Sequence, residues 1–258
     1  IQALFFADGG LLALGCNIFN LGFFTCFVAY PLIYKPLVSK VFTPTRMFTA
    51  ALLAAVIGLQ LGAFGVVLET LFSGKSELPF NTFVLLMQPI HLAIGLVEGL
   101  VTAAVAGFVW RARPEILEKA SLGEALGSIS MKKVLSGLIV AALFTGGVLS
   151  WFASSQPDGL EWSMFKTAGV EELDAEGGVH EALGDLQQKV AILPDYSFKT
   201  PEAGEEPVSG QVEETAWPAV STGTSVSGII GGLMTLVLAV ITGTVISIIK
   251  RRAKADTA

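Results

Sequence analysis

The 258-residue sequence contains little charge, only two cysteines and only two histidines. Cys16 and Cys26 lie on one expected helix, separated by about 15 Å at the usual helical rise, and this distance excludes a disulfide between them. Patterns of the Cys-x-x-Cys, Walker-loop, Gly-x-Ser-x-Gly and His-Glu-x-x-His types are absent. The sequence therefore gives no support for an ATPase or a soluble hydrolase, and the two thiols are expected to pack in the interior.

Apolar residues dominate what is present. Hydrophobic residues make up 52% of the chain, charged residues make up 15%, and the mean hydropathy is +0.67. These values are typical of integral membrane proteins. A helix needs about 20 apolar residues to cross the hydrocarbon layer, and the stretches that meet or approach this length are 11–34, 47–72, 80–110, 134–152 and 226–249. We therefore predict an all-α, polytopic transmembrane helix bundle with about five spans.

The basic residues predict the orientation of this bundle. Twelve of the sixteen Lys and Arg follow the first, third or fifth stretch. Because positive residues are retained on the cytoplasmic side, the carboxyl terminus is predicted to be cytoplasmic in a multi-pass protein of the cell (inner) membrane. Residues 1–6 have the character of the last turns of a helix, so the sequence is expected to be a fragment that lacks an amino-terminal part.

The same orientation makes residues 153–222 a long extracytoplasmic loop. This segment carries fourteen Asp or Glu against three Lys, and such an acidic balance argues against nucleic acid as a partner. One interpretation is a surface that attracts cations, and the other is a solvated tether. Only one short helix is expected in it, over 179–192.

Ionisable side chains within membrane spans are costly and are usually paired or functional. His91 and Glu98 are two helical turns apart, and Gln88 lies one turn before His91, so we predict one polar stripe that faces the bundle interior. The stripe can belong to a metal site, because imidazole suits nickel, cobalt, copper and zinc. It can equally be a set of hydrogen bonds that fixes helix packing.

Asp8 precedes two glycines and a helix. Its carboxylate is expected to cap the helix amino terminus, while Gly9 and Gly10 allow another segment to approach closely. Asn17 and Asn20 follow inside the same span, where unpaired amides would be expensive, so we expect them to bond to a neighbouring loop or helix.

Three segments resemble known transport proteins. Residues 2–22 (QALFFADGGLLALGCNIFNLG), and residues 91–102 (HLAIGLVEGLVT) followed by 111–115 (RARPE), resemble the nickel/cobalt substrate-capture (S) subunits of energy-coupling-factor (ECF) transporters, the NikM/CbiM type. The run 157–161 (PDGLE) is similar to the PDGLE domain of the small NikN-type accessory subunit, which has two transmembrane helices joined by an extracytoplasmic loop.

The resemblance implies a fusion of the two subunits, with a NikM/CbiM-like membrane domain over 1–130 and a NikN-like PDGLE domain over 131–258. Proteins of this type capture Ni²⁺ or Co²⁺ outside the cell as the transported substrate and use no organic cofactor. They deliver the ion through a complex with a transmembrane coupling (T) subunit and two cytoplasmic ATPase subunits. The chain is therefore expected not to be an enzyme itself.

The family's metal ligands lie in an amino-terminal Met-His segment and in a second His-bearing loop, and neither occurs in this sequence. No metal ligand and no catalytic residue is therefore assigned. Asp8, Asn17, His91 and Glu98 remain candidates for supporting the metal site or the structure. The PDGLE resemblance favours nickel over cobalt.

Two other classes of function compete with this interpretation. The first is a membrane-anchored extracytoplasmic metal sensor or assembly protein, in which the acidic loop binds a partner. Buried polar residues in the third span argue against a mere anchor. The second is a membrane-embedded hydrolase, which ranks last because His91 has no Ser or Cys partner on its own helix.

Overall fold

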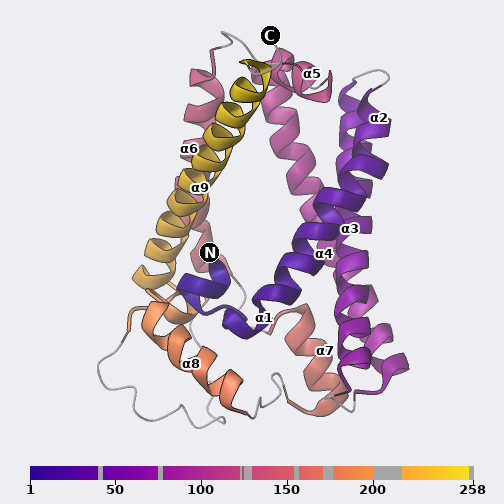
Figure 1. Ribbon diagram of the computed structural model, residues 1–258, viewed down its shortest axis with the longest axis vertical. Coiled ribbons are helices and arrows are strands. Elements are labelled where there is room, and N and C mark those ends of the chain that lie inside the picture. The colour runs from indigo at the N-terminus through magenta and orange to yellow at the C-terminus, as the bar shows by residue number, and fades with distance from the viewer. Residues whose placement is uncertain are drawn as a thin grey trace. The chain divides into compact units, whose positions relative to one another are not determined.

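The computed structural model describes residues 1–39, 43–74, 78–122, 124, 130–153, 157–170, 177–199 and 217–255 (Figure 1). The described residues form helices and turns and no strand, which confirms the all-α prediction. They divide into two compact units. The first unit contains Ile1–Ala13, Leu138–Ser155 and Gly177–Ala258, and the second contains Leu14–Gly137 and Gln156–Glu176.

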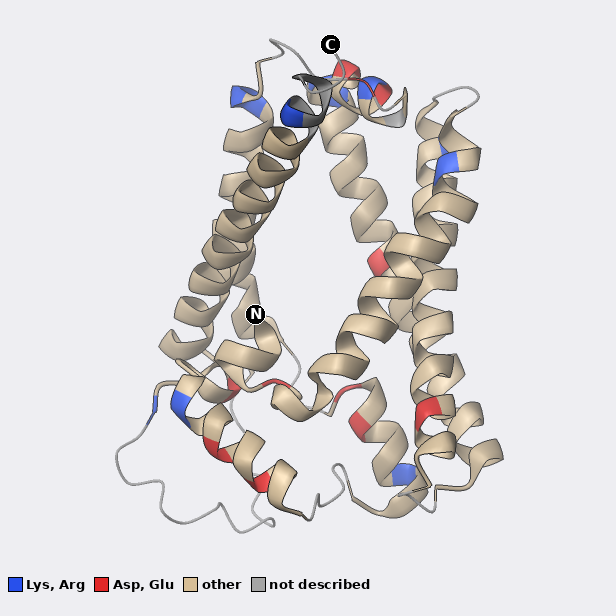
Figure 2. Ribbon diagram, viewed as in Figure 1, with Lys and Arg blue, Asp and Glu red and all other residues tan. Residues whose placement is uncertain are grey.

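Within the described ranges, four helices are long and apolar enough to cross a membrane. They are Gly10–Ser39, Pro44–Ser73, Phe80–Ala112 and Thr222–Ile249. Four of the predicted spans are therefore present as long helices. Figure 2 shows that the charged residues of these helices lie mostly toward their ends, as a hydrocarbon layer requires.

The fifth predicted span is shorter than expected. Helix α6 covers Lys132–Gly147 in 16 residues, and a 3₁₀ turn, η3 (Leu149–Phe152), follows it. The α-helix ends because Val148 has a non-helical backbone, with φ −122° and ψ −50°. At 1.5 Å per residue, α6 alone covers roughly 24 Å, less than the ~30 Å of a hydrocarbon core.

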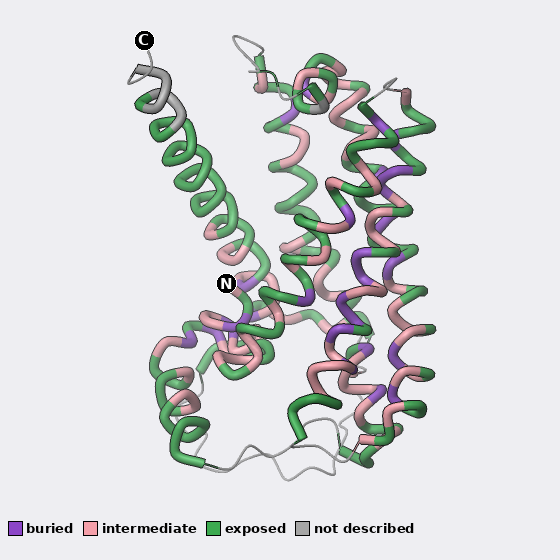
Figure 3. The backbone as a smooth tube through the Cα atoms, turned by 45° about the vertical axis from the view of Figure 1, so that its right-hand side comes forward, coloured by how far each residue is buried: buried purple, intermediate pink, exposed green. Residues whose placement is uncertain are grey.

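The second unit is built around α3 (Pro44–Ser73). This helix packs against η2 (Ile18–Tyr34), a π-helix that continues α1 (Gly10–Asn17) and leads into α2 (Lys35–Ser39). It also packs against α4 (Phe80–Ala112), which α5 (Pro114–Leu122) follows. Figure 3 shows the buried positions concentrated along these helices.

Local signals explain where α3 begins and ends. The Thr43 side chain accepts a hydrogen bond from the Arg46 N–H at 3.3 Å, and Pro44 occupies the first turn, where its missing N–H costs nothing. Gly74 ends the helix with φ 61°, a left-handed conformation that glycine adopts without strain. Buried glycines then let α3 approach its neighbours closely, which is how helices associate in lipid.

The first unit contains η1 (Gln2–Phe6), residues 138–147 of α6, η3, α8 (Gly178–Val190), η4 (Pro194–Tyr196) and α9 (Thr222–Ala255). Helix α8 confirms the short helix predicted in the acidic loop, but the prediction of only one helix there was wrong, because a second one, α7 (Gly159–Ala168), also forms. Close to the start of α9, a Cβ on Gly228 would lie 2.9 Å from the Gly146 Cα. Trp151 Nε1 donates to Ser225 Oγ at 2.6 Å, and Ser225 Oγ donates to the Gly147 carbonyl at 2.8 Å.

The two cysteines are not packed in the interior, so this prediction was wrong. Cys16 and Cys26 are both exposed. For Cys26 the reason is that η2 faces α3 with other residues, of which Asn20 and Ala29 are buried, and for Cys16 it is that α1 has no buried residue.

Candidate functional site around Asp8 and the Pro157–Glu161 motif

Asp8 lies in a left-handed turn between η1 and α1. Ala7, Gly9 and Gly10 have φ values of 59°, 64° and 60°, and the two glycines adopt this left-handed conformation at little cost. The Asp8 carboxylate accepts hydrogen bonds from the Tyr196 hydroxyl and, at 3.5 Å, from Gln2 Nε2. Its predicted capping role was therefore wrong, because these two side chains take up the carboxylate.

Gln187 of α8 caps α1 instead. Its Oε1 accepts a hydrogen bond from the Leu11 N–H at 2.9 Å, and its Nε2 donates to the Leu4 carbonyl at 3.1 Å. One side chain thus joins the two ends of the Asp8 turn. The Ile192 N–H adds a third connection by donating to the Phe5 carbonyl at 2.8 Å. No spacing in the sequence could connect position 187 with positions 4 and 11.

Tyr196 closes the Asp8 turn from the side of η4. Its ring centroid lies 5.4 Å from that of Phe6. Burial, and then the hydrogen bond to Asp8, raise the pKa of Tyr196 to about 12, because both disfavour the phenolate. The hydroxyl is therefore a proton donor to Asp8 throughout the physiological pH range.

We expect the Tyr196 phenol to titrate near pH 12 when its ultraviolet absorbance is followed in a Tyr30→Phe, Tyr34→Phe background. Asp8→Asn should lower this pKa while leaving it above the ordinary 10.0, because burial is the larger cause. The raised pKa contributes stability that is complete below pH 10 and is lost as the pH rises through about 12. Asp185→Asn on α8 is the matched control. An equal effect of both substitutions would contradict the Asp8–Tyr196 contact.

Asn20 and Glu69 form a polar pair inside the second unit. Asn20 is 3% exposed, and its Nδ2 donates to Glu69 Oε2 at 2.8 Å. This agrees with the expectation that Asn20 bonds to a neighbouring helix. Two glycines of α3 make room for it, since a Cβ on Gly65 would lie 2.2 Å from Asn20 Oδ1 and one on Gly62 would lie 2.6 Å from the Asn20 carbonyl oxygen. Asn17 is half-buried and outside this pair.

A second polar contact joins α3 to α4. Gln60 Nε2 donates to the Gln88 carbonyl at 2.9 Å, and Gln88 Nε2 donates to the Gln60 carbonyl at 3.4 Å. For Gln88, therefore, the packing interpretation fits the contacts. Both amides are half-buried, where such bonds replace costly unpaired groups.

His91 and Glu98 do not join in one site. His91 is half-buried, and its Nδ1 lies 2.8 Å from the Met87 carbonyl oxygen of the preceding turn. Glu98 is exposed and lines a different part of α4. The predicted interior stripe was therefore wrong for Glu98, because its side chain is exposed and lies beside residues of η2 and α3.

The Pro157–Glu161 motif begins α7 (Gly159–Ala168) with a capping box. Asp158 Oδ1 accepts from the N–H groups of Leu160 at 2.7 Å and Glu161 at 2.8 Å, while Glu161 Oε2 accepts from the Asp158 N–H at 2.9 Å. Three N–H groups at the helix start are satisfied in this way. The Asp-x-x-Glu spacing is a capping signal that can be read directly from the sequence.

The glycine of the motif brings α7 against α4. A Cβ on buried Gly159 would lie 3.1 Å from His91 Cε1 and 3.2 Å from Ile94 Cδ1. One turn later, Ser163 is fully buried. Leu160 and Met164 pack on the buried cluster that α3 and α4 form, which consists of Ala63, Val67, Phe83 and Met87. Helix α7, which begins with this motif, therefore docks on the segment of α4 that contains His91.

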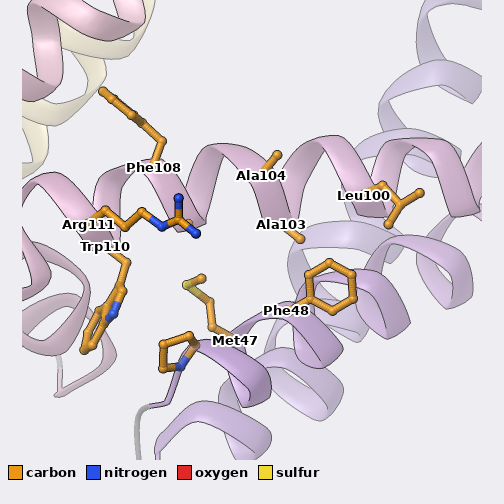
Figure 4. Close-up of a pocket in the computed structure, with 10 residues that line it drawn as sticks. Met47, Phe48, Leu100, Ala103, Ala104, Phe108, Trp110 and Arg111 are labelled. Atoms are coloured by element: carbon orange, nitrogen blue, oxygen red, sulfur yellow. The ribbon is translucent and has the colours of Figure 1, made fainter.

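A further hollow, of about 650 Å³, lies between α3 and the end of α4. Figure 4 shows Met47, Phe48 and Leu100 around it, with the Arg111 side chain extending along it. Its lining is mostly apolar and offers no carboxylate, imidazole or thiol. In the part of the chain that the structure describes, no group of three or more His, Cys, Asp and Glu side chains could hold a metal ion.

Comparison with known proteins separates the chain into two regions. Residues 1–116 match the model of the cobalt uptake substrate-specific transmembrane region (CbiM), and residues 132–248 match the PDGLE domain. Neither region alone matches half of the chain. No solved structure was found to match it.

Among curated proteins, the chain is 27% identical over 238 residues to a fused nickel transport protein NikMN of Archaeoglobus fulgidus, covering 92% of this chain and 66% of that protein. It is 32% identical over 117 residues to a metal transport protein of Haloquadratum walsbyi, covering 45% of this chain and 51% of that protein. It is 30% identical over 133 residues to a cobalt transport protein CbiM of Sorangium cellulosum, covering 46% and 53%. The chain thus spans between half and two thirds of these relatives. The chain, with its membrane-length helices, is thus similar to the CbiM transmembrane region over residues 1–116 and to the PDGLE domain over residues 132–248.

Proposed function

We propose that this chain is the substrate-binding membrane component of an ECF-type importer for nickel or cobalt ions. It would capture the divalent cation outside the cell and pass it onward in a complex. A transmembrane coupling subunit would complete the membrane part, and two cytoplasmic ATPase subunits would hydrolyse ATP, so this chain would not be an enzyme. The names of its relatives, which refer to nickel, cobalt and metal transport, support this proposal.

The observation that carries the proposal is the exchange of segments between the two family regions. The Asp8 turn of the CbiM region is held by Gln187 and Tyr196 of the PDGLE region. Separately, the PDGLE motif packs on the His91 segment of the CbiM region. Each compact unit therefore contains residues from both family regions. This is expected if the two regions function together, and not if one region is only a membrane anchor and the other only a tether.

The same proposal includes a topology and a division of the chain. We place the carboxyl terminus in the cytoplasm and residues 153–222 outside the cell (inner) membrane. The NikM/CbiM-like domain would cover residues 1–130 and the NikN-like PDGLE domain residues 131–258. Residues 1–13 of the first domain would then pack with the second domain, and residues 156–176 of the second domain would pack with the first. Asp8, Asn17, His91 and Glu98 would support capture without being the metal's own ligands.

Uptake of radioactive nickel and cobalt by cells that express the full reading frame with its coupling and ATPase subunits tests the proposal. We expect accumulation of at least one metal above cells that lack this chain. Asp8→Ala and His91→Ala should each reduce it severalfold, because each change removes a contact between the two family regions. Asp185→Ala, an exposed residue of α8 outside both contacts, should leave uptake unchanged.

The complex must be shown to assemble, by copurification of its subunits, before the uptake result is interpreted. If the assembled complex accumulates neither metal, the uptake proposal fails and a membrane-anchored sensor or assembly protein becomes the leading interpretation. If uptake occurs but neither variant changes it, the contacts around Asp8 and His91 serve packing alone.

A further inference from the structure

Helix η2 winds as a π-helix over all of its 17 residues, Ile18–Tyr34. This winding forms hydrogen bonds between residues five apart, and it usually lasts for a single turn inside an α-helix, often at a functional site. One such bond ends η2, since the Lys35 N–H donates to the Tyr30 carbonyl. Helix η2 therefore keeps a winding that is rare in proteins through several turns, and its contacts must hold it there.

The contact with α3 explains this winding. Thr25 and Ala29 lie against Gly58, whose Cβ would be 3.2 Å from Thr25 Cγ2 and 3.3 Å from Ala29 Cβ. Asn20 lies against Gly62, whose Cβ would be 2.6 Å from the Asn20 carbonyl oxygen. The spacing of these three residues along η2 is five positions and then four. At about 4.4 residues per turn, they fall within roughly 50° of one another, whereas at about 3.6 residues per turn they would spread over half the circumference.

Only the step from Asn20 to Thr25 requires the π winding. The four-residue step from Thr25 to Ala29 stays on one face in either winding, because it turns roughly 40° past a full turn in an α-helix and about 30° short of one in a π-helix. If the first step wound as an α-helix, Leu21 would take the place of Asn20 on α3. The Thr25 hydroxyl already donates to the Leu21 carbonyl at 2.5 Å, which is the acceptor that the Thr25 N–H would use in an α-helix.

Each winding has a contact that the other lacks. In the π winding, Asn20 is 3% exposed and its Nδ2 donates to Glu69 Oε2 at 2.8 Å. Its Oδ1, however, is buried without a hydrogen-bond partner among the described residues, which is costly. In the α winding, Asn20 would lose Glu69, while η2 would recover regular geometry and Leu21, which is now exposed, would pack on the glycines of α3. The hydrogen bond between Asn20 and Glu69 therefore holds the π winding in place.

We propose that η2 is a register switch with two states, one in which Asn20 lies against α3 and one in which Leu21 does. Passage between them changes the winding only over residues 20–25 and leaves the rest of the contact with α3 in place. Because α1 continues directly into η2, the switch also turns Asn17 by about a quarter turn relative to α3. In placing this movement in the capture of the metal ion, the inference rests on the proposed function.

Methyl NMR of the full reading frame in lipid nanodiscs, with isotope-labelled leucine methyl groups, tests the switch without altering its residues. The Leu21 signals are assigned by their loss in a Leu21→Ile protein. We expect them to report exchange between two environments on a timescale of microseconds to seconds. Glu69→Ala should raise the share of the second environment severalfold, because it removes the hydrogen bond to Asn20.

Glu115→Ala, which changes an exposed glutamate of α5, is the matched control and should leave the Leu21 signals unchanged. A single Leu21 environment in both the wild-type and the Glu69→Ala protein would overturn the switch. So would an equal response to Glu69→Ala and Glu115→Ala.

Deletion of Gly22 tests whether the extra residue between Asn20 and Thr25 is needed. The deletion shortens this step to four residues, so both side chains can reach α3 from an ordinary α-helix and Leu21 no longer competes. We expect the deletion protein to be at least as stable as wild type in denaturant, to show one Leu21 environment and, in the assembled complex, to lose metal uptake severalfold. Gly22→Ala keeps the register, and because a Cβ there meets nothing within 4 Å it should resemble wild type in all three measurements.

The deletion can contradict the proposal in three ways. The deletion protein could fail to fold while the Gly22→Ala protein folds, it could keep two Leu21 environments, or it could take up metal as wild type does. Each of these results would overturn the register switch.

The NMR measurement does not depend on transport. If Leu21 exchanges as expected but the wild-type complex accumulates no metal, the import function fails while the switch stands. If metal accumulates but Leu21 shows one environment in every protein, the switch fails while the import function stands.

Discussion

Gly62→Ala is expected to destabilise the second unit by about 1–3 kcal/mol, the usual cost of overpacking a close contact. The new Cβ would lie 2.6 Å from the Asn20 carbonyl oxygen. This atom belongs to the backbone of η2, so it cannot move aside as the end of a flexible side chain could. The substitution must therefore push η2 away from α3 or strain both helices, and it also threatens the Asn20–Glu69 hydrogen bond.

Denaturant unfolding of the purified protein in detergent would measure this effect. Gly22→Ala is the matched control, because a Cβ there would have no neighbour within 4 Å, and it should leave stability the same or slightly higher. Equal stabilities of the Gly62→Ala and Gly22→Ala proteins would show that η2 and α3 are not packed as closely as described.

Gly159→Leu is expected to release α7 from α4. Even its first atom, the Cβ, would lie 3.1 Å from His91 Cε1 and 3.2 Å from Ile94 Cδ1, and the rest of the side chain has no space between them. Release exposes Leu160 and Met164, which pack on the buried cluster. Full burial of one large apolar side chain contributes about 1.5–3 kcal/mol, and Leu160 and Met164 contribute less because both are only partly buried. We therefore expect the free energy of docking α7 to fall by about 2–3 kcal/mol.

Digestion with trypsin measures this release, because α7 contains the exposed residue Lys166. As long as α7 is docked, its helical backbone cannot enter the protease active site and the bond after Lys166 is protected. We expect cleavage after Lys166 to become at least about tenfold faster in the Gly159→Leu protein, since proteolysis follows the population of the open state. Gly184→Leu in α8, where a Cβ would meet nothing within 4 Å, is the control. Cleavage at Lys189 gives an internal reference in the first unit. A Gly159→Leu protein that is cleaved after Lys166 as slowly as wild type would refute the docking role of the motif.

Some features follow from local sequence alone. The long apolar stretches predict the four membrane-length helices because helix formation in lipid depends mainly on length and hydropathy. The short helix α8 could also be predicted, and so could the capping box of Asp158 and Glu161, whose partners are only three residues apart. The break at Val148 had no such signal, since α6 and the residues beyond it remain apolar.

The contacts of the candidate site do not follow from local sequence. Helical spacing placed His91 and Glu98 on one stripe, but the side chains that surround them come from α7 and η2, which the spacing on α4 cannot reveal. Asp8 was expected to serve its own helix, yet Tyr196, 188 positions away, takes its carboxylate. Polar groups near a membrane bond to whichever partner tertiary packing brings within reach, because leaving them unpaired is costly.

The sequence by itself determined the membrane-bundle class, the long helices, and the resemblance to a CbiM region followed by a PDGLE domain, because hydropathy and short motifs are local properties of the chain. Only the tertiary structure decided that the PDGLE motif packs beside His91, that Gln187 holds the Asp8 turn, and that Glu98 lines a groove. These contacts join residues tens to nearly two hundred positions apart. They depend on how helices pack in three dimensions, which local spacing does not encode.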